Sequence, residues 1–108
     1  MFEELKNALA ALAIPIAEFS WDTRPDTDYM VITLDGTGDT VYANDKMEHQ
    51  APRGTIDLYS KSNDRSKMLA VQDVLNNFEG CAWYLNTIMY ENDTQLLHWE
   101  FAFELVDW

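Results

Sequence analysis

The first segment of the chain carries apolar residues at the spacing of an amphipathic helix. These residues are Phe2, Leu5, Leu9, Leu12 and Ile16. Their intervals of three and four residues place them on one face of a helix, and the alanines between them favour the same structure. Because the residue before a proline is disfavoured in the helical conformation, Pro15 predicts that this helix ends near Ala13.

A second helix is predicted before Gly80. Its apolar residues, at intervals of three, four and three, are Met68, Val71, Leu75 and Phe78. Side chains that can cap a helix N-terminus precede it at Ser62, Asn63 and Asp64, and a glycine commonly follows a helix C-terminus. The sequence therefore marks both ends of this helix.

Runs rich in β-branched and aromatic residues predict five strands. We expect them at Tyr29–Leu34, Thr40–Ala43, Met47–Ser60, Ala82–Tyr90 and Leu96–Val106. In the last run, apolar residues alternate with His98, Glu100 and Glu104, which indicates a strand with one buried and one solvated face. Pro52 and Gly54 interrupt the long third run, so we expect a bend or an edge position there.

The segment between the first two predicted strands contains two glycines flanked by acidic residues. It comprises Asp35, Gly36, Thr37, Gly38 and Asp39. Glycine tolerates the positive φ angles that tight reversals between antiparallel strands require. We therefore predict an exposed hairpin tip here, since carboxylates are costly to bury, and we take it as the candidate loop for contact with a neighbouring protein.

These elements predict one α+β domain that spans residues 1–108. The order is helix, three strands, helix, two strands (α-β-β-β-α-β-β), which favours an antiparallel sheet of about five strands with two helices packed on one face. A length of 108 residues and a mass of 12.5 kDa fit a single core. We expect that core to contain Leu9, Leu12, Ile56, Leu58, Leu75, Phe78, Trp99, Phe101 and Phe103.

The chain is strongly acidic, with 19 Asp and Glu against 7 Lys and Arg and a formal net charge of −12. This charge repels phosphates and anionic lipid headgroups, so specific nucleic-acid binding is not expected.

No apolar run approaches the roughly 20 residues of a membrane span, and the N-terminus lacks the features of a secretory signal. We therefore expect no membrane association and a cytosolic protein when it is made. The lone Cys81 cannot form an intramolecular disulfide.

No group of residues has the spacing of a known catalytic or metal-binding motif. Residues 33–37 are similar to the Asp-x-Asp-Gly-Thr signature of aspartate-nucleophile phosphatases, but Thr33 occupies the position of the nucleophile. The remaining candidates are the acidic residues Asp35, Asp39 and Asp45 and the histidines His49 and His98. The acidic residues lack the spacing of a calcium-binding loop, and the histidines fall in different predicted strands. We therefore predict no catalytic residues, no cofactor site and no metal site.

Aromatic residues are abundant, with four Trp, five Tyr and five Phe. Several of them gather in the last two predicted strands, where the neighbours Trp83 and Tyr84 must point to opposite faces of the sheet. Most of this aromatic mass belongs in the core, but some of it should stay exposed for a protein partner. The sequence therefore favours a structural or interaction protein.

Seven short segments carry a resemblance that extends over nearly the whole chain. They are Leu5–Leu9, Ile14–Phe19, Tyr29–Thr33, Asp39–Asp45, Gly54–Ser60, Tyr90–Glu91 and His98–Phe101. In order and spacing they resemble a family of small phage and prophage tail proteins, grouped with minor tail and tail-completion proteins and similar in plan to tail terminators. The resemblance implies a virion protein of the tail or neck, present in the host cytoplasm before assembly. It also implies a homo-oligomer, such as a hexameric ring, that contacts other tail or head–tail connector proteins and has no catalytic residues.

Two functions of other classes compete with this one. An acidic inhibitor that mimics DNA and occupies a nuclease or restriction enzyme needs its carboxylates on one face, whereas they fall in almost every predicted element. A small enzyme needs a catalytic constellation, and the sequence offers none. We therefore expect a non-enzymatic component of the tail-terminator or tail-completion kind.

Overall fold

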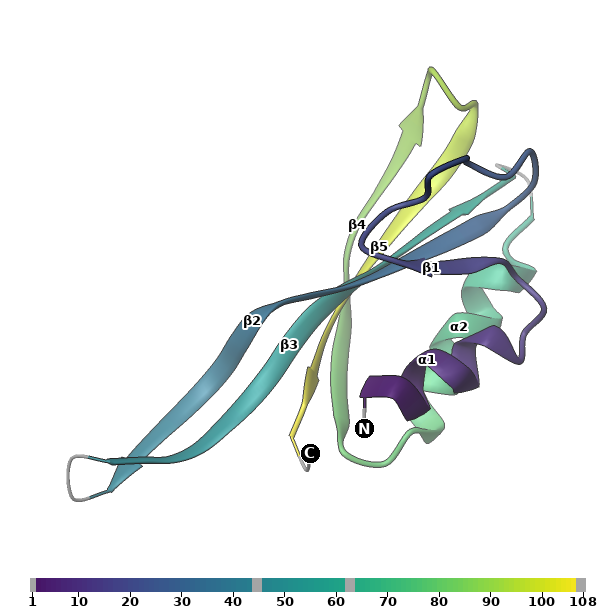
Figure 1. Ribbon diagram of the computed structural model, residues 1–108. Coiled ribbons are helices and arrows are strands. Elements are labelled where there is room, and N and C mark those ends of the chain that lie inside the picture. Colours follow the sequence, from purple (N-terminus) through teal and green to yellow (C-terminus); the bar gives the residue numbers. More distant parts are fainter. Residues whose placement is uncertain (1, 44–45, 62–63, 107–108) are drawn as a thin grey trace.

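A computed structural model describes residues 2–43, 46–61 and 64–106, with the backbone alone over residues 37–50. The elements are α1 (Phe2–Ala10), β1 (Ile16–Glu18), β2 (Tyr29–Ala43), β3 (Lys46–Ser60), α2 (Ser66–Asn77), β4 (Cys81–Glu91) and β5 (Leu96–Leu105). The chain is an α+β protein with two helices and five strands (Figure 1), which confirms the predicted fold class.

The sheet has the strand order β1-β2-β3-β5-β4, and it is mixed rather than antiparallel. Three of the four strand pairs are antiparallel, but β1 runs parallel to β2, with Ile16 opposite Met30. The sequence predicted no strand at β1, because Ile16 continues the apolar spacing of the first helix. The helix instead ends at Ala10, and Ala13 adopts a φ of 61°, which turns the chain toward the edge of the sheet.

The predicted boundaries of the first strands are wrong. The runs predicted at residues 29–34 and 40–43 form one strand, β2, which pairs with β3 along almost its whole length. The pairing is irregular between Leu34 and Gly36 and between Thr37 and Thr40. The glycines therefore fall at β-bulges within a strand rather than at a reversal. Asn44 and Asp45, which follow β2, are residue types that favour a turn and lie outside the described residues.

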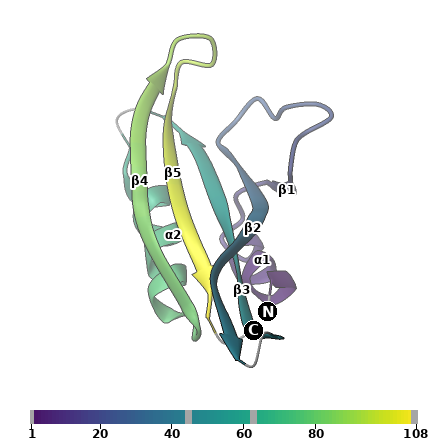
Figure 2. The same ribbon diagram turned by 90° about the vertical axis from the view of Figure 1, so that its left-hand side faces the viewer.

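Both helices pack on one face of the sheet, as Figure 2 shows from the other side, with the helices behind the strands. The buried core contains Leu5, Leu9, Ile14, Met30, Ile32, Ile56, Leu58, Met68, Val71, Leu75, Trp99, Phe101, Phe103 and Leu105. The core predicted from sequence is confirmed, except that Leu12 and Phe78 are only partly buried against it. Within this core the indole Nε1 of Trp99 donates a hydrogen bond of 2.8 Å to Ser60 Oγ, so the polar atom of a buried aromatic ring has a partner.

The second helix begins close to where the sequence predicted. Asp64 Oδ1 accepts a hydrogen bond of 2.9 Å from the backbone N–H of Ser66, the first residue of α2. This contact satisfies one of the free N–H groups of the first turn. The other two predicted capping residues, Ser62 and Asn63, lie outside the described residues. Neither helix in the described part of the chain has the length and apolar character needed to cross a bilayer.

A ten-residue loop joins β1 to β2 and is anchored at its end. Asp28 is only 3% exposed and forms an ion pair of 2.9 Å with Lys67 of α2. Trp21, in the same loop, donates a hydrogen bond of 3.1 Å from its indole nitrogen to the carbonyl oxygen of Met30. The ion pair therefore ties the end of the loop to α2, and the hydrogen bond ties Trp21 to β2.

Candidate functional site

The strands β2 and β3 extend beyond the rest of the sheet as a two-stranded arm, which we define as residues 35–43 and 46–52 (Figure 1). In the described part of the sheet, β5 pairs with β3 only from Arg53 to Ser60, and β1 pairs with β2 only from Met30 to Ile32. Both outer edges of the arm therefore present backbone N–H and C=O groups without a neighbouring strand. Such edges are templates for pairing with another chain.

The candidate loop predicted from sequence lies at the base of this arm and is not a hairpin tip. All five of its residues, Asp35, Gly36, Thr37, Gly38 and Asp39, belong to β2. The side chain of Asp35 accepts a hydrogen bond of 2.6 Å from Thr55 Oγ1 on β3, and Gly36 lies opposite Arg53. The segment is thus tied to the neighbouring strand, and the rest of the arm projects beyond it. Its proposed role in contact with a neighbour stays a prediction.

The opposite edge of the sheet, β4, is long and carries exposed apolar side chains. These are Tyr84, Ile88, Met89 and Tyr90, with exposed fractions between 49% and 61%. Trp83 instead packs against the core and donates a hydrogen bond of 3.0 Å to Asn76 of α2. The predicted opposite orientation of Trp83 and Tyr84 is confirmed. Exposed apolar side chains on an edge strand indicate a surface for protein contact.

A stack of rings crosses three strands on the helix-free face of the sheet. Tyr29 of β2 stacks on Tyr59 of β3 with ring centroids 4.6 Å apart, and Tyr59 stacks on His98 of β5 at 4.4 Å. Trp21 of the loop meets Tyr29 edge to face at 6.4 Å. Strand pairing causes this stack, because Tyr59 lies directly opposite both Tyr29 and His98. Burial raises the pKa of the Tyr29 and Tyr59 hydroxyls.

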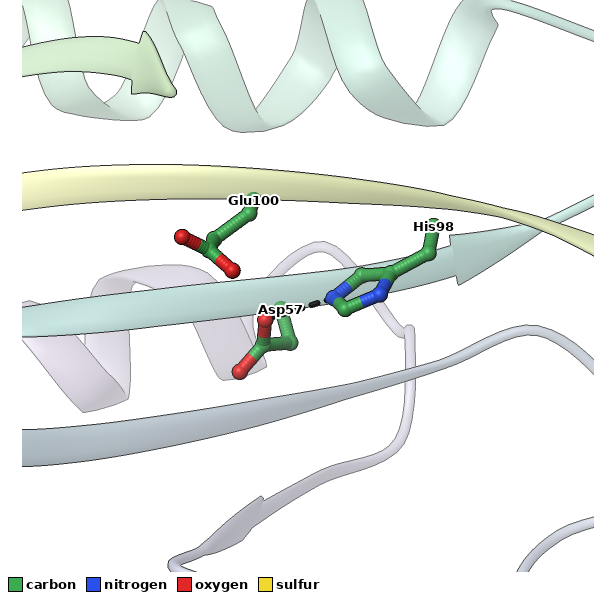
Figure 3. A group of neighbouring side chains, drawn as sticks. All are labelled: Asp57, His98 and Glu100. Carbon is green, nitrogen blue, oxygen red and sulfur yellow. Dashed lines mark hydrogen bonds and ion pairs between the residues drawn. The ribbon is translucent and has the colours of Figure 1, made fainter. Parts of the chain in front are cut away.

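His98 ends this stack and lies between two carboxylates. Its Nε2 is 2.6 Å from Asp57 Oδ1, and its Nδ1 is 3.0 Å from Glu91 Oε1. The hydrogen bond to Asp57 raises the pKa of His98, while partial burial opposes the rise. A third carboxylate, that of Glu100, points toward the same space (Figure 3) and accepts a hydrogen bond of 2.6 Å from Asn86 Nδ2.

Two open grooves flank this group on the helix-free face. One, of about 480 Å³, lies over β3, β5 and β4 and is lined in part by Arg53, Tyr84, Glu100 and Glu104. The other, of about 530 Å³, lies between the β1–β2 loop and the sheet, where Phe19 and Arg24 border it. Asp57 and Tyr59 line the second groove. The group around His98 is therefore accessible from solvent on both sides.

Of the remaining candidate residues, Cys81 is described and lies apart from this group. Cys81 begins β4 and packs partly against the core, and burial raises the pKa of its thiol to about 11. This environment suits a packing role, because a thiol that stays protonated is a poor nucleophile. The side chains of His49 and Asp39 lie outside the described residues, as does the whole of Asp45.

The group around His98 was not predicted from sequence. Asp57 and His98 are separated by 41 positions, and neither belongs to a motif. One signal was present, because His98 and Glu100 alternate with apolar residues and so had to share the solvated face of their strand.

A scan against protein-family models finds no match to the chain, and a search of curated proteins finds none either.

Proposed function

We propose that this protein is a non-enzymatic structural subunit of a phage or prophage tail, of the tail-terminator or tail-completion kind, which assembles with copies of itself into a ring. The observation that carries the proposal is a pair of open strand edges on opposite sides of one sheet. One is the arm of β2 and β3, and the other is β4 with its exposed apolar side chains.

Two different complementary surfaces on one subunit favour head-to-tail assembly. If the arm of one copy adds a strand to β4 of the next, each copy uses its arm on one side and its β4 edge on the other. Such a heterologous contact forms a closed ring when a whole number of copies, each rotated by the same angle from the last, completes 360°. Main-chain hydrogen bonds then supply affinity, and the exposed side chains of β4 supply specificity.

The order of the elements also supports the proposal. The family that the sequence resembles has an N-terminal helix, a turn containing proline, strands, a second helix and a C-terminal hairpin. The elements α1, β2 with β3, α2 and β4–β5 follow that order, and the segments that resemble its first two strands both fall in β2. The net charge of −12 is compatible with a ring around a channel for DNA, because a negative wall repels phosphates and lets DNA slide.

Shortening the arm tests the proposal directly. Replacing residues 38–51 by Asn-Gly joins Thr37 to Pro52, which lie opposite each other, through a two-residue hairpin turn. The variant should retain the circular dichroism spectrum and cooperative unfolding of the parent. It should lose oligomerisation, as measured by light scattering coupled to size exclusion, and it should no longer bind to the ends of purified tail tubes.

The β4–β5 hairpin offers a matched control. Glu91 and Leu96 lie opposite each other and flank a four-residue turn, so replacing residues 92–95 by Asn-Gly shortens the other hairpin of the sheet in the same way. This variant should assemble like the parent. If the variant with the shortened arm assembles equally well, the arm is not the contact, and the proposed ring geometry is wrong.

A charged substitution on β4 tests whether this edge takes part in the interface. Ile88→Lys places a cation on an edge strand, where lysine is known to block strand addition. Leu69→Lys is the control, because Leu69 is similarly exposed but lies on α2. We expect monomers from the first variant and normal assembly from the second. Equal behaviour of the two variants would exclude β4 from the interface.

One observation favours the competing function of an acidic DNA mimic. The helix-free face gathers carboxylates from four strands, namely Asp35, Asp57, Glu91, Glu100 and Glu104. A mimic would bind a nuclease or restriction enzyme as a monomer and compete with DNA in a salt-dependent manner. A chain that is monomeric at all salt concentrations, even with tail tubes present, and that competes with DNA would replace the tail proposal with this one.

A further inference from the structure

We propose that Asp57, His98 and Glu100 form a binding site for a divalent transition-metal ion on the helix-free face of the sheet. Each residue offers one ligand atom, and these three atoms lie within 4.8 Å of one another (Figure 3). One imidazole nitrogen and two carboxylate oxygens are a common donor set for such ions. The site does not depend on the proposed role in a phage tail.

The paired strands hold the three residues in place. Asp57 lies directly opposite Glu100, and Tyr59, two residues further along β3, lies opposite His98. All three ligands therefore project from one side of β3 and β5, two inner strands of the sheet. Residues on inner strands move little, so the ligand atoms are positioned before an ion arrives.

Only a small rearrangement is needed to admit an ion. With bonds of about 2.0–2.2 Å to nitrogen and oxygen, ligand atoms around a tetrahedral ion lie roughly 3.3 Å apart. The present separation of Nε2 and Asp57 Oδ1 is 2.6 Å, so these two atoms must part by less than an ångström. Asp57 and Glu100 are both partly exposed, which leaves room for their side chains to rotate.

Residues around the three ligands hold them as the outer shell of a metal site does. Glu91 Oε1 accepts a hydrogen bond from Nδ1 of His98 at 3.0 Å. Nε2 donates to Asp57 in the metal-free protein, so an ion must displace the Nε2 proton, and the contact with Glu91 then keeps the remaining proton on Nδ1. Tyr59 stacks on the imidazole and fixes its plane, and Asn86 orients the Glu100 carboxylate. Carboxylate–histidine–metal arrangements of this kind are typical of protein metal sites.

The charge of the group also calls for a cation. Three carboxylates, those of Asp57, Glu91 and Glu100, surround one imidazole. Among the side chains that the structure describes, neither Lys nor Arg forms an ion pair with any of the three. A proton on His98 balances one negative charge, whereas a divalent ion bound to neutral imidazole balances two.

The donor set selects the type of ion. Imidazole favours Zn²⁺, Co²⁺ and Ni²⁺, and the mixed nitrogen–oxygen set also accommodates Mn²⁺. Mg²⁺ and Ca²⁺ prefer oxygen ligands only and should bind more weakly. Three protein ligands leave at least one coordination position for water, and the side chains of His98 and Asp57 are 12% and 20% exposed, so solvent reaches the site.

Calorimetric titration of chelator-treated protein with Zn²⁺, Mn²⁺ and Mg²⁺ tests the site, and Co²⁺ absorption spectra report on its ligands. We expect one Zn²⁺ per chain and weaker binding of Mg²⁺. His98→Ala and Asp57→Asn should each weaken Zn²⁺ binding by more than about 100-fold, beyond the usual effect of an outer-shell change. Glu104→Gln is the control, because it removes a charge from the same strand and face outside the group.

Glu91 is a positioning residue and has its own test. Glu91→Leu should weaken Zn²⁺ binding about 10- to 100-fold with little change in the urea unfolding midpoint, and Glu91→Gln, whose carbonyl oxygen can still accept from Nδ1, should restore most of the affinity. The proposal is overturned if none of the transition-metal ions binds below millimolar concentration. It is also overturned if folded His98→Ala and Asp57→Asn proteins bind Zn²⁺ as tightly as the Glu104→Gln control.

Discussion

The ring of Phe103 occupies the space that a side chain at position 54 would need. Gly54 lies directly opposite Phe103 and Leu34, at the point where β3 is paired on both sides. A Cβ atom on Gly54 would lie 2.7 Å from Cζ of Phe103 and would overlap the carbonyl oxygen of Thr33. Glycine is therefore required at this position by packing, because neither a strand backbone nor a buried ring can move away freely.

Gly54→Ala should destabilise the protein. We expect a loss of about 1–3 kcal/mol in the free energy of unfolding, the usual cost of inserting a methyl group into a packed core. Urea denaturation measures the loss. Ala82→Ser, an exposed change of similar size on β4, should stay within about 0.5 kcal/mol of the parent. An unchanged midpoint for Gly54→Ala would mean that β3 and β5 are less closely packed at this point.

Phe101→Ala should cost about 3–5 kcal/mol, because it leaves a large cavity in the centre of the core. Phe101 is completely buried and contacts the ring of Trp83 at a centroid distance of 5.9 Å. Tyr84→Ala is the control, since Tyr84 is 61% exposed on the neighbouring strand. A loss below roughly 1 kcal/mol for Phe101→Ala would place this residue in solvent and shift the β5 register by one position.

The thiol of Cys81 should react slowly in the folded protein. Burial raises its pKa from 9.0 to about 11, so the folded state carries roughly 100-fold less thiolate at pH 8 than the unfolded chain. Alkylation with iodoacetamide, with and without denaturing urea, measures this ratio. Equal rates in both conditions would contradict the burial of the thiol.

The same shift has a consequence for stability at high pH. Because the folded pKa lies above the unfolded value, the folded state keeps its proton longer, and the free energy of unfolding falls as the pH rises from about 9 to about 11. Cys81→Ala should fall less steeply over this range in urea titrations at successive pH values. Parallel curves for the parent and the variant would show that other groups cause the whole decline.

Salt should favour the proposed ring. Each copy brings a formal charge of −12, so subunits approach against mutual repulsion. The Debye length shortens from about 30 Å at 0.01 M salt to about 8 Å at 0.15 M, which weakens that repulsion. Light scattering at constant protein concentration should therefore detect small species at low salt and a larger closed oligomer at high salt. Dissociation by salt would instead indicate an interface held by ion pairs.

The sequence by itself determined the parts of the fold that depend on local spacing. The apolar periods of Leu5 and Leu9 and of Met68, Val71 and Leu75 identify both helices, because helical neighbours are three or four residues apart. The alternation along β5 identifies its buried face for the same reason, since neighbouring residues of a strand point to opposite sides. Fold class, both helices and most of the core follow from these local rules.

Tertiary pairing decided the rest. The spacing of Ile16 fits a helix, yet it pairs with Met30 in a strand, and the glycines of residues 35–39 suit a turn, yet they lie within β2 beside β3. The group around His98 depends in the same way on β3 meeting β5, which brings Asp57 next to a histidine 41 positions away. A local pattern specifies which conformations a segment tolerates, whereas its partner strand selects one of them through hydrogen bonds and burial that no short window of sequence contains.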